Sequence, residues 1–193
     1  MFKIFFYINE LKDIQKENLN QLRNVNIIYR NYKRNNYYNN AAKLNKYCKK
    51  MNFKLYISND KQLATRINCY GLYIPSFNNR DYFARSNLRI IGSAHNEIEI
   101  RDKIKQGCKE IFISPIFNTN SHINKTGKGL AFYRPLMHKY SKQVNVHALG
   151  GINQKNLSKI ISSGSKGFSS KGMTEQKMDK SLISYLNLIA TNL

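Results

Sequence analysis

The sequence predicts a single-domain (β/α)8 barrel of the TIM type. Short apolar runs alternate with polar stretches of helical spacing along the 193 residues, which is the pattern of parallel β/α units. Eight such runs recur at intervals of roughly twenty residues, the number of strands that closes a barrel. An open, doubly wound sheet is the alternative, and it is favoured if the fourth or the eighth run does not form a strand.

The apolar runs are predicted strands because they are short and rich in β-branched and aromatic residues. In chain order they cover residues 2–8, 25–29, 53–57, 71–74, 88–91, 110–116, 144–149 and 167–170. Helical spacing predicts helices at 38–51, 96–106, 131–142, 154–162 and 175–189, among others. The last has an approximate apolar face of Met178, Leu182, Ile183, Tyr185, Leu186 and Ile189. We treat residues 1–193 as one domain because no linker or low-complexity segment divides them.

The strong positive charge does not by itself indicate a nucleic-acid partner. The chain has 32 Lys and Arg against 11 Asp and Glu, a formal net charge of +21, which permits binding to nucleic acid or anionic lipid. However, the basic residues are spread over every segment, and Asn, Ile and Tyr are also abundant, as in proteins from AT-rich genomes. We therefore expect no specific nucleic-acid partner, and attraction of anionic substrates instead.

The termini and cysteines predict an ordinary intracellular environment. Polar residues follow the apolar start without a small-residue cleavage site, so residues 2–8 are a first strand and not a signal peptide. No run approaches the ~18–20 apolar residues of a membrane span. Cys48, Cys69 and Cys108 are odd in number and widely spaced, which indicates reduced thiols and no disulfide or metal site. We expect a cytoplasmic protein without membrane contact. The sequence does not decide between a monomer and a homo-oligomer.

Two strand ends predict one site for a phosphorylated small molecule. The sixth run leads into the hydroxyl- and amide-rich segment 114–121, and the seventh ends in Gly150 and Gly151. Glycines leave room for an anion to reach backbone N–H groups. Barrel active sites lie at the C-terminal strand ends, often with a phosphate after strands seven and eight. The polar residues that follow the other runs, namely Arg30, Asn59, Asp60, Ser93 and Thr119, would surround this mouth, and the eighth run ends there with Ser170 and Gly172.

With these residues in order, the chain resembles the thiamine phosphate synthase / TenI superfamily over about residues 25–173. The family's fifth strand reads I-G-x-S-x-H, and residues 91–95 follow it with one residue fewer. The sixth strand and loop, G-P-I-F-x-T-x-T-K, are similar to residues 114–122, and the seventh, A-I-G-G-I-x-x-x-N, to 148–156. The third, I-I-N-D, is close to residues 56–60. The order and spacing of the four motifs carry the resemblance.

The resemblance implies a transferase that joins a pyrimidine methyl pyrophosphate to a thiazole phosphate and releases pyrophosphate. By position it implies pyrophosphate contacts from Arg30, Asn59, Ser93, Thr119 and Ser121, and a Mg²⁺ ligand at Asp60. It places the thiazole phosphate at Gly150 and Gly151, with Ser170 and Gly172 at the end of strand eight. Ser93 and His122 are the candidate catalytic residues. Mg²⁺ suits this chemistry because negative charge develops on the leaving group.

The departures from the family pattern keep two other functions open. Ile28 and Tyr32 replace the Gln and Lys of the strand-two motif, His122 replaces the strand-six Lys, and Asn78 stands where a metal-binding Asp is usual. A TenI-like thiazole phosphate tautomerase needs no pyrophosphate site, and His122 is then its acid or base. A non-catalytic barrel that binds a phosphate ligand or nucleic acid is the third interpretation.

Each candidate residue also has a structural alternative. Asp60 is a suitable N-cap for the helix that follows, and Ser93 or His95 could cap the helix that begins near Asn96. Gly150 and Gly151 could form only a tight turn. If they contact a phosphate, Gly151→Val should abolish binding of thiazole phosphate and leave the protein folded.

Overall fold

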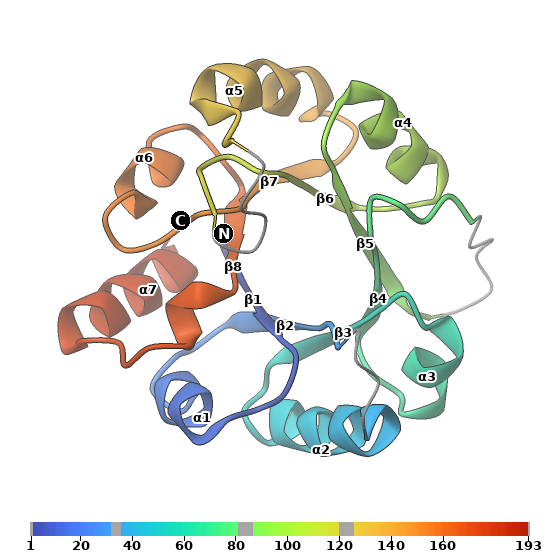
Figure 1. The fold of residues 1–193 in the computed structure, drawn as a ribbon, viewed down its shortest axis with the longest axis vertical. Helices are drawn as coiled ribbons and strands as arrows, with labels where there is room; N and C mark the ends of the chain where they lie inside the picture. Colours follow the sequence, from blue (N-terminus) through green and yellow to red (C-terminus); the bar gives the residue numbers. More distant parts are fainter. Residues whose placement is uncertain (1, 32–35, 81–86, 120–125, 193) are drawn as a thin grey trace.

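The chain forms a closed parallel barrel. The computed structural model describes residues 2–31, 36–80, 87–119 and 126–192, and in these ranges eight strands close in chain order (Figure 1). They are β1 (Lys3–Ile8), β2 (Val25–Tyr29), β3 (Lys54–Ser58), β4 (Gly71–Ile74), β5 (Arg89–Ala94), β6 (Glu110–Ile113), β7 (Asn145–Leu149) and β8 (Gly167–Ser170). β8 pairs back to β1, with Ile4 opposite Phe168. The predicted barrel is confirmed, and the open sheet is wrong.

Helices form an outer ring around the strands (Figure 1). The helices of the described ranges are α1 (Asp13–Leu19), α2 (Tyr37–Lys50), α3 (Lys61–Arg66), α4 (Glu97–Lys105), α5 (Gly129–Tyr140), α6 (Leu157–Ile161), α7 (Lys180–Asn192) and the short 3₁₀ helix η2 (Gly172–Thr174). Because each helix returns the chain to the start of the next strand, helix N-termini and strand C-termini lie at the same end of the barrel. We call this end the mouth.

Alternation along the strands divides the core into two layers. On β1, Phe5 and Tyr7 belong to a cluster inside the barrel, whereas Ile4, Phe6 and Ile8 belong to the larger layer between strands and helices. The inner cluster is mostly aromatic and consists of Phe5, Tyr7, Ile28, Tyr56, Tyr73, Ile91 and Phe112, with Leu149 against it. The barrel interior is therefore filled by side chains, and ligands have access only at its ends.

Two predicted strand ends are wrong by three residues, and the other strand boundaries agree to within one residue. β5 continues beyond Ile91 to Ala94, because Gly92 and Ser93 pair with the neighbouring strand opposite Ile111 and Phe112. β6 ends at Ile113, three residues early, because the backbone N–H of Ile116 turns to the carbonyl of Leu149. These corrections place Ser93 on a strand.

The last helix begins later than its sequence pattern predicts. The expected helix 175–189 starts only at Lys180, because Asp179 caps it by accepting from the N–H of Leu182 and the side chain of Asn18 holds the preceding segment. Its Nδ2 donates to the carbonyls of Thr174 and Gln176, and its Oδ1 accepts from the N–H of Met178. The residues of the predicted apolar face are buried, apart from Tyr185, which is 38% exposed.

A buried ionic cluster fills the N-terminal end of the barrel, opposite the mouth. Glu110 Oε1 lies 2.6 Å from Lys3 Nζ, and its Oε2 lies 3.0 Å from Nε2 of the fully buried His147. Burial raises the pKa of Glu110, but the hydrogen bond and charge of His147 and those of Lys3 outweigh it and lower this pKa to about 2. Burial lowers the pKa of His147, against the opposing effect of Glu110. The cluster is remote from the mouth, and we assign it to stability.

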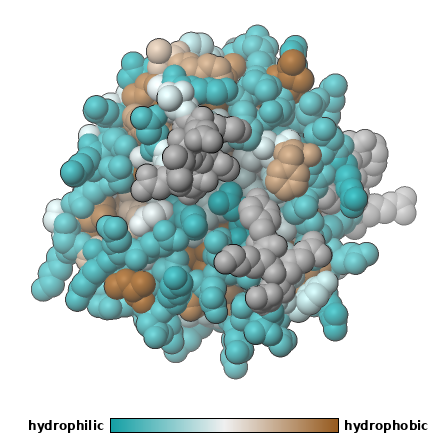
Figure 2. Space-filling view, in the orientation of Figure 1, coloured by the Kyte–Doolittle hydropathy of each residue, from teal (hydrophilic) through white to brown (hydrophobic). Residues whose placement is uncertain are grey.

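Cys48, Cys69 and Cys108 are free and buried. Burial raises the pKa of the Cys48 and Cys108 thiols to about 12, so both stay protonated and unreactive near neutral pH. The face in Figure 2 is mostly hydrophilic, with hydrophobic residues scattered over it. None of the helices in the described ranges has the length and apolar content needed to cross a membrane.

Candidate functional site

Arg30 lies at the mouth on the inner aromatic cluster. It directly follows β2, and its N–H donates to the carbonyl of Ile8 at 3.0 Å. Its guanidinium carbon lies 4.4 Å from the centre of the Tyr7 ring, a cation–π geometry. The Tyr7 hydroxyl in turn donates to that of Tyr73, 2.8 Å away. Arg30 is only half-buried, so the Tyr7 ring supports a cation that an anion in the mouth can approach.

Asn59 and Asn78 form a pair between the ends of β3 and β4. Nδ2 of Asn78 donates to Oδ1 of Asn59. Asn59 has a left-handed backbone with φ of 61°, and its N–H donates to the carbonyl of Tyr73 at 2.9 Å. Asn78 is 7% exposed, whereas Asn59 is exposed. A pyrophosphate contact in this corner would therefore come from Asn59.

Asp60 is the N-cap of α3, as its structural alternative predicts. Its Oδ1 accepts from the N–H of Leu63 at 2.8 Å. The described residues contain no group of three or more His, Cys, Asp or Glu that could hold a metal. Mg²⁺, however, is commonly held by one or two carboxylates together with substrate phosphates and water. The donor set therefore fits one Mg²⁺ that is shared between Asp60 and a bound pyrophosphate.

Ser93 points from β5 toward the segment after β4. It is 5% exposed, and its Oγ accepts from the N–H of Ser76 at 3.1 Å. It does not cap a helix, because Asn96 caps α4 by accepting from the N–H of Glu99. His95 does not cap it either, and its Nδ1 lies 3.0 Å from the Glu99 carboxylate. Ser93 thus joins two strand ends of the mouth, and His95 has a structural role.

Gly150 and Gly151 form a turn that is packed against the loop after β6. Both have positive φ, 98° and 66°. A Cβ at Gly150 would lie 2.9 Å from Pro115 Cα, and one at Gly151 would lie 2.3 Å from the carbonyl oxygen of Asn118. The close contact contradicts the expectation that Gly151→Val leaves the protein folded, because the added side chain would displace the protein's own loop.

The end of β8 completes this side of the mouth. Ser170 Oγ donates to the carbonyl of Ile152 at 2.9 Å and accepts from the N–H of Met173, so it ties β8 to the turn after β7. Gly172 begins η2, and a Cβ there would meet nothing within 4 Å. The backbone N–H groups of Gly151 and Gly172 have no acceptor among the described residues. Two donors without acceptors beside a glycine turn suit an anion.

The remaining candidates lie in the loop after β6. Thr119 is half-buried six residues beyond the end of β6. Ser121 and His122 fall outside the described residues, as do Tyr32 and its neighbours 33–35. The loop is anchored on both sides, because Gly127 N–H donates to Oδ1 of Asn118 at 2.7 Å.

Sequence reasoning missed the aromatic floor of the mouth. Tyr7 and Tyr73 come from opposite sides of the barrel in Figure 1 and meet at their hydroxyl groups. Alternation along β1 could have placed Tyr7 inside, but the pairing depends on ring directions that a sequence does not contain. Ser58, beside Tyr73 on β3, has a buried hydroxyl without a partner among the described residues, and it is a second missed polar group.

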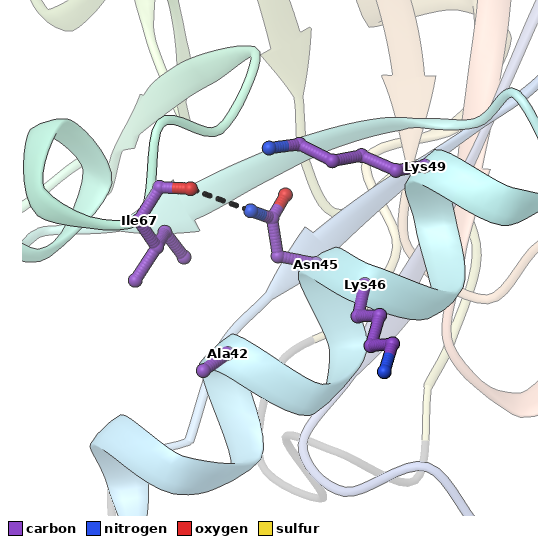
Figure 3. A pocket seen from close by; sticks show the side chains of 5 residues that line it. All are labelled: Ala42, Asn45, Lys46, Lys49 and Ile67. Atoms are coloured by element: carbon purple, nitrogen blue, oxygen red, sulfur yellow. Dashed lines mark hydrogen bonds between the residues drawn. The ribbon is translucent and has the colours of Figure 1, made fainter.

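The surface pocket in Figure 3 is a separate feature. It is lined by Ala42, Asn45, Lys46, Lys49 and Ile67. Asn45 points to the end of α3 and donates to the carbonyl of Ile67, whereas Lys46 points away from it (Figure 3). Except for Ala42, these residues lie in the C-terminal half of α2 or at the C-terminal end of α3, and those helix ends face away from the mouth. The pocket therefore does not belong to the candidate site.

Comparison with known sequences identifies relatives of the chain. Residues 10–171 match the family described as thiamine monophosphate synthase. A thiamine-phosphate synthase of Flavobacterium johnsoniae is 30% identical over 156 residues, which cover 76% of this chain and 74% of the relative. One from Prochlorococcus marinus subsp. pastoris is 30% identical over 72% of this chain, but the match covers only 41% of that longer protein.

Comparison with solved structures supports the fold. A thiamine phosphate pyrophosphorylase from Pyrococcus furiosus superimposes with a TM-score of 0.78 and covers 98% of this chain and 95% of its own. The two are 16% identical in sequence. At this identity the likeness establishes the barrel, and any function must be argued from the residues of the mouth.

Proposed function

The chain belongs to the thiamine monophosphate synthase family. We propose that it joins the pyrimidinylmethyl group of a pyrimidine methyl pyrophosphate to a thiazole phosphate, which gives thiamine phosphate and pyrophosphate. The transfer breaks the bond between the methylene carbon and the pyrophosphate oxygen, and the electron pair leaves with pyrophosphate. A new bond joins the methylene carbon to the thiazole. The enzyme must therefore hold two anionic groups at a fixed separation.

The observation that carries this proposal is the division of the mouth into two polar halves. Arg30, Asn59, Asp60 and Ser93 follow or end β2, β3 and β5, whereas Gly151 and Gly172 follow β7 and β8. These strands occupy different arcs of the barrel (Figure 1). A substrate pair with one anion at each end matches this division, with the Tyr7–Tyr73 floor between the halves.

The first half suits a leaving pyrophosphate. Arg30 supplies a permanent cation, which favours the negative charge that develops as the carbon–oxygen bond breaks. Asn59 and Ser93 offer neutral polar groups that orient the phosphate oxygens. Asp60 would hold Mg²⁺ together with the pyrophosphate, and the ion would neutralise part of the negative charge on the leaving group. Thr119 and Ser121 add hydroxyl donors from the loop after β6.

The second half suits the thiazole phosphate. The backbone N–H groups of Gly151 and Gly172 have no acceptor among the described residues, and the space beside Gly172 Cα is open. Ser170 holds the two loops together. Backbone donors are rigid and neutral, so they bind a phosphate without competing for the Mg²⁺ that accompanies the pyrophosphate.

One observation favours the tautomerase alternative. The amide of Asn78 donates to Asn59 in the corner where the resemblance implies a second metal-binding carboxylate. A tautomerase needs only the phosphate half of the mouth and an acid or base such as His122. The alternatives differ in product, and one assay distinguishes them.

The test is incubation of the purified chain with both synthase substrates and Mg²⁺. We expect thiamine phosphate and pyrophosphate in equal amounts, and no product when either substrate is omitted. Arg30→Ala should form product much more slowly. Isomerisation of a thiazole phosphate by the parent, without thiamine phosphate formation, would support the tautomerase and contradict the proposal. Absence of both reactions would leave a binding protein.

A further inference from the structure

Lys103 on α4 is a buried ammonium group that points toward the mouth. The residue is 0% exposed, although a lysine on the outer helical ring usually reaches solvent. Side chains of a helix lean toward its N-terminus, and the N-terminus of α4 lies at the mouth. Lys103 Nζ accordingly donates to the backbone carbonyl of Asn78 at 2.7 Å and to Gln106 Oε1 at 2.8 Å.

Gln106 holds the same segment from the end of α4. Its Nε2 donates to the carbonyls of Asn78 and Arg80, each at 2.9 Å. The carbonyl of Asn78 therefore accepts from an ammonium and from an amide at once. These three bonds fix the backbone that follows β4.

The segment after β4 contains Asn78, whose side-chain amide is hydrogen-bonded to Asn59. Asn78 Oδ1 accepts from the N–H of Arg80 at 2.8 Å, and the Asn78 N–H donates to the carbonyl of Pro75 at 3.1 Å. These bonds leave its Nδ2 directed to Oδ1 of Asn59. Displacement of the Asn78 backbone would therefore move Asn59, and Asp60 is the next residue.

The absence of a side chain at Gly92 leaves space for the stem of Lys103. A Cβ at Gly92 on β5 would lie 2.9 Å from Lys103 Cδ, so a larger residue there would displace the stem. No carboxylate of the described residues forms an ion pair with Lys103, and burial lowers its pKa. A buried ammonium is costly unless it is hydrogen-bonded, and here carbonyl oxygens supply those bonds.

We propose that Lys103 is a positioning residue for the pyrophosphate half of the mouth. With Gln106 it holds the backbone of Asn78, whose amide orients Asn59 beside Asp60. The identity of the ligand, pyrophosphate, rests on the proposed function. The hydrogen bonds that link Lys103 to Asn59 do not depend on it. Its consequence is that a residue outside the barrel determines how the pyrophosphate half binds, without contact with substrate.

Lys103→Met tests this, because it keeps the stem and removes the ammonium. Lys105→Met, an exposed position on the same helix, is the matched control. We expect a folded Lys103→Met protein whose dissociation constant for magnesium pyrophosphate rises about tenfold. Its affinity for thiazole phosphate should stay within about twofold of the parent's, and Lys105→Met should equal the parent for both.

A second readout needs no ligand. The side-chain amide NMR signals of Asn59 and Asn78 should shift in Lys103→Met and not in Lys105→Met. If the parent binds no magnesium pyrophosphate while these signals shift, the proposed function fails and the positioning role stands. If Lys103→Met is folded with parent-like signals and affinities, or loses both ligands equally, the positioning role is wrong. If it does not fold, Gln106→Leu, which keeps the ammonium, is judged by the same criteria.

Discussion

The carbonyl oxygen of Asn118 occupies the space that a Cβ atom of Gly151 would need. The distance would be 2.3 Å, and Gly151 has a φ of 66°, so the position combines close backbone contact with a left-handed conformation. We predict that Gly151→Ala destabilises the protein by about 2 kcal/mol or more. Urea unfolding measures this, with Gly172→Ala as the control, which should change stability by less than about 0.5 kcal/mol. Equal effects at the two glycines would contradict the packing described for the turn.

Ser93→Ala should lower turnover more than it lowers stability. The substitution leaves the N–H of Ser76 without its acceptor, which costs about 1 kcal/mol in a buried place. It also removes a hydroxyl from the pyrophosphate half. Steady-state kinetics and thermal unfolding of the same preparation separate the two effects. Parent-like turnover in a variant that has lost stability would reduce Ser93 to a structural residue.

Acid should destabilise the protein partly through Glu110. Its pKa is lowered from 4.5 to about 2 in the fold, so its contribution is present above pH 4.5 and is lost as the pH falls toward 2. The contribution is on the order of 3 kcal/mol. Glu110→Gln should be less stable than the parent near pH 7, and its free energy of unfolding should fall less between about pH 5 and about pH 2.5. Parallel pH profiles for the two proteins would show that Lys3 and His147 do not hold this carboxylate in its charged form.

The charge of +21 should give weak binding to DNA or RNA that depends on salt and not on sequence. The affinity should fall steeply as salt rises, because each neutralised phosphate releases counterions. Fluorescence anisotropy with two unrelated duplexes over a salt series measures it. A complex with one duplex alone that persists near ~0.2 M salt would indicate a nucleic-acid function.

The strands were predictable because a barrel strand is a short apolar run with a distinct end. Even so, the end of β5 was missed, since Gly92 and Ser93 interrupt the apolar pattern while still pairing with β6. Apolar content cannot reveal a strand whose last residues line a polar mouth. The start of α7 was missed for two reasons: Asp179 caps the helix by accepting from the N–H of Leu182, a local signal in the sequence, and Asn18 holds the preceding segment from 160 residues away.

The candidate site was predictable only as a set of strand ends. Arg30, Asn59 and Gly150 each directly follow a strand, so position along the chain locates them at the mouth. The links between strand ends were not predictable. Asn78 was noted only as a missing carboxylate, and Lys103 was not singled out from the sequence. Their bonds depend on the path of the segment after β4, which no periodicity encodes.

Calorimetry on two variants, each with two ligands, tests most directly whether the mouth has two separate anion sites. Arg30→Ala removes a cation from one half, and Gly172→Asp places a negative charge in open space at the other without a steric clash. Each variant and the parent are titrated with magnesium pyrophosphate and with thiazole phosphate, and circular dichroism confirms the fold. We predict that Arg30→Ala loses pyrophosphate binding and keeps the thiazole phosphate, whereas Gly172→Asp shows the reverse. If folded variants lose both ligands together, or Gly172→Asp binds thiazole phosphate like the parent, the division of the mouth into two anion sites is contradicted.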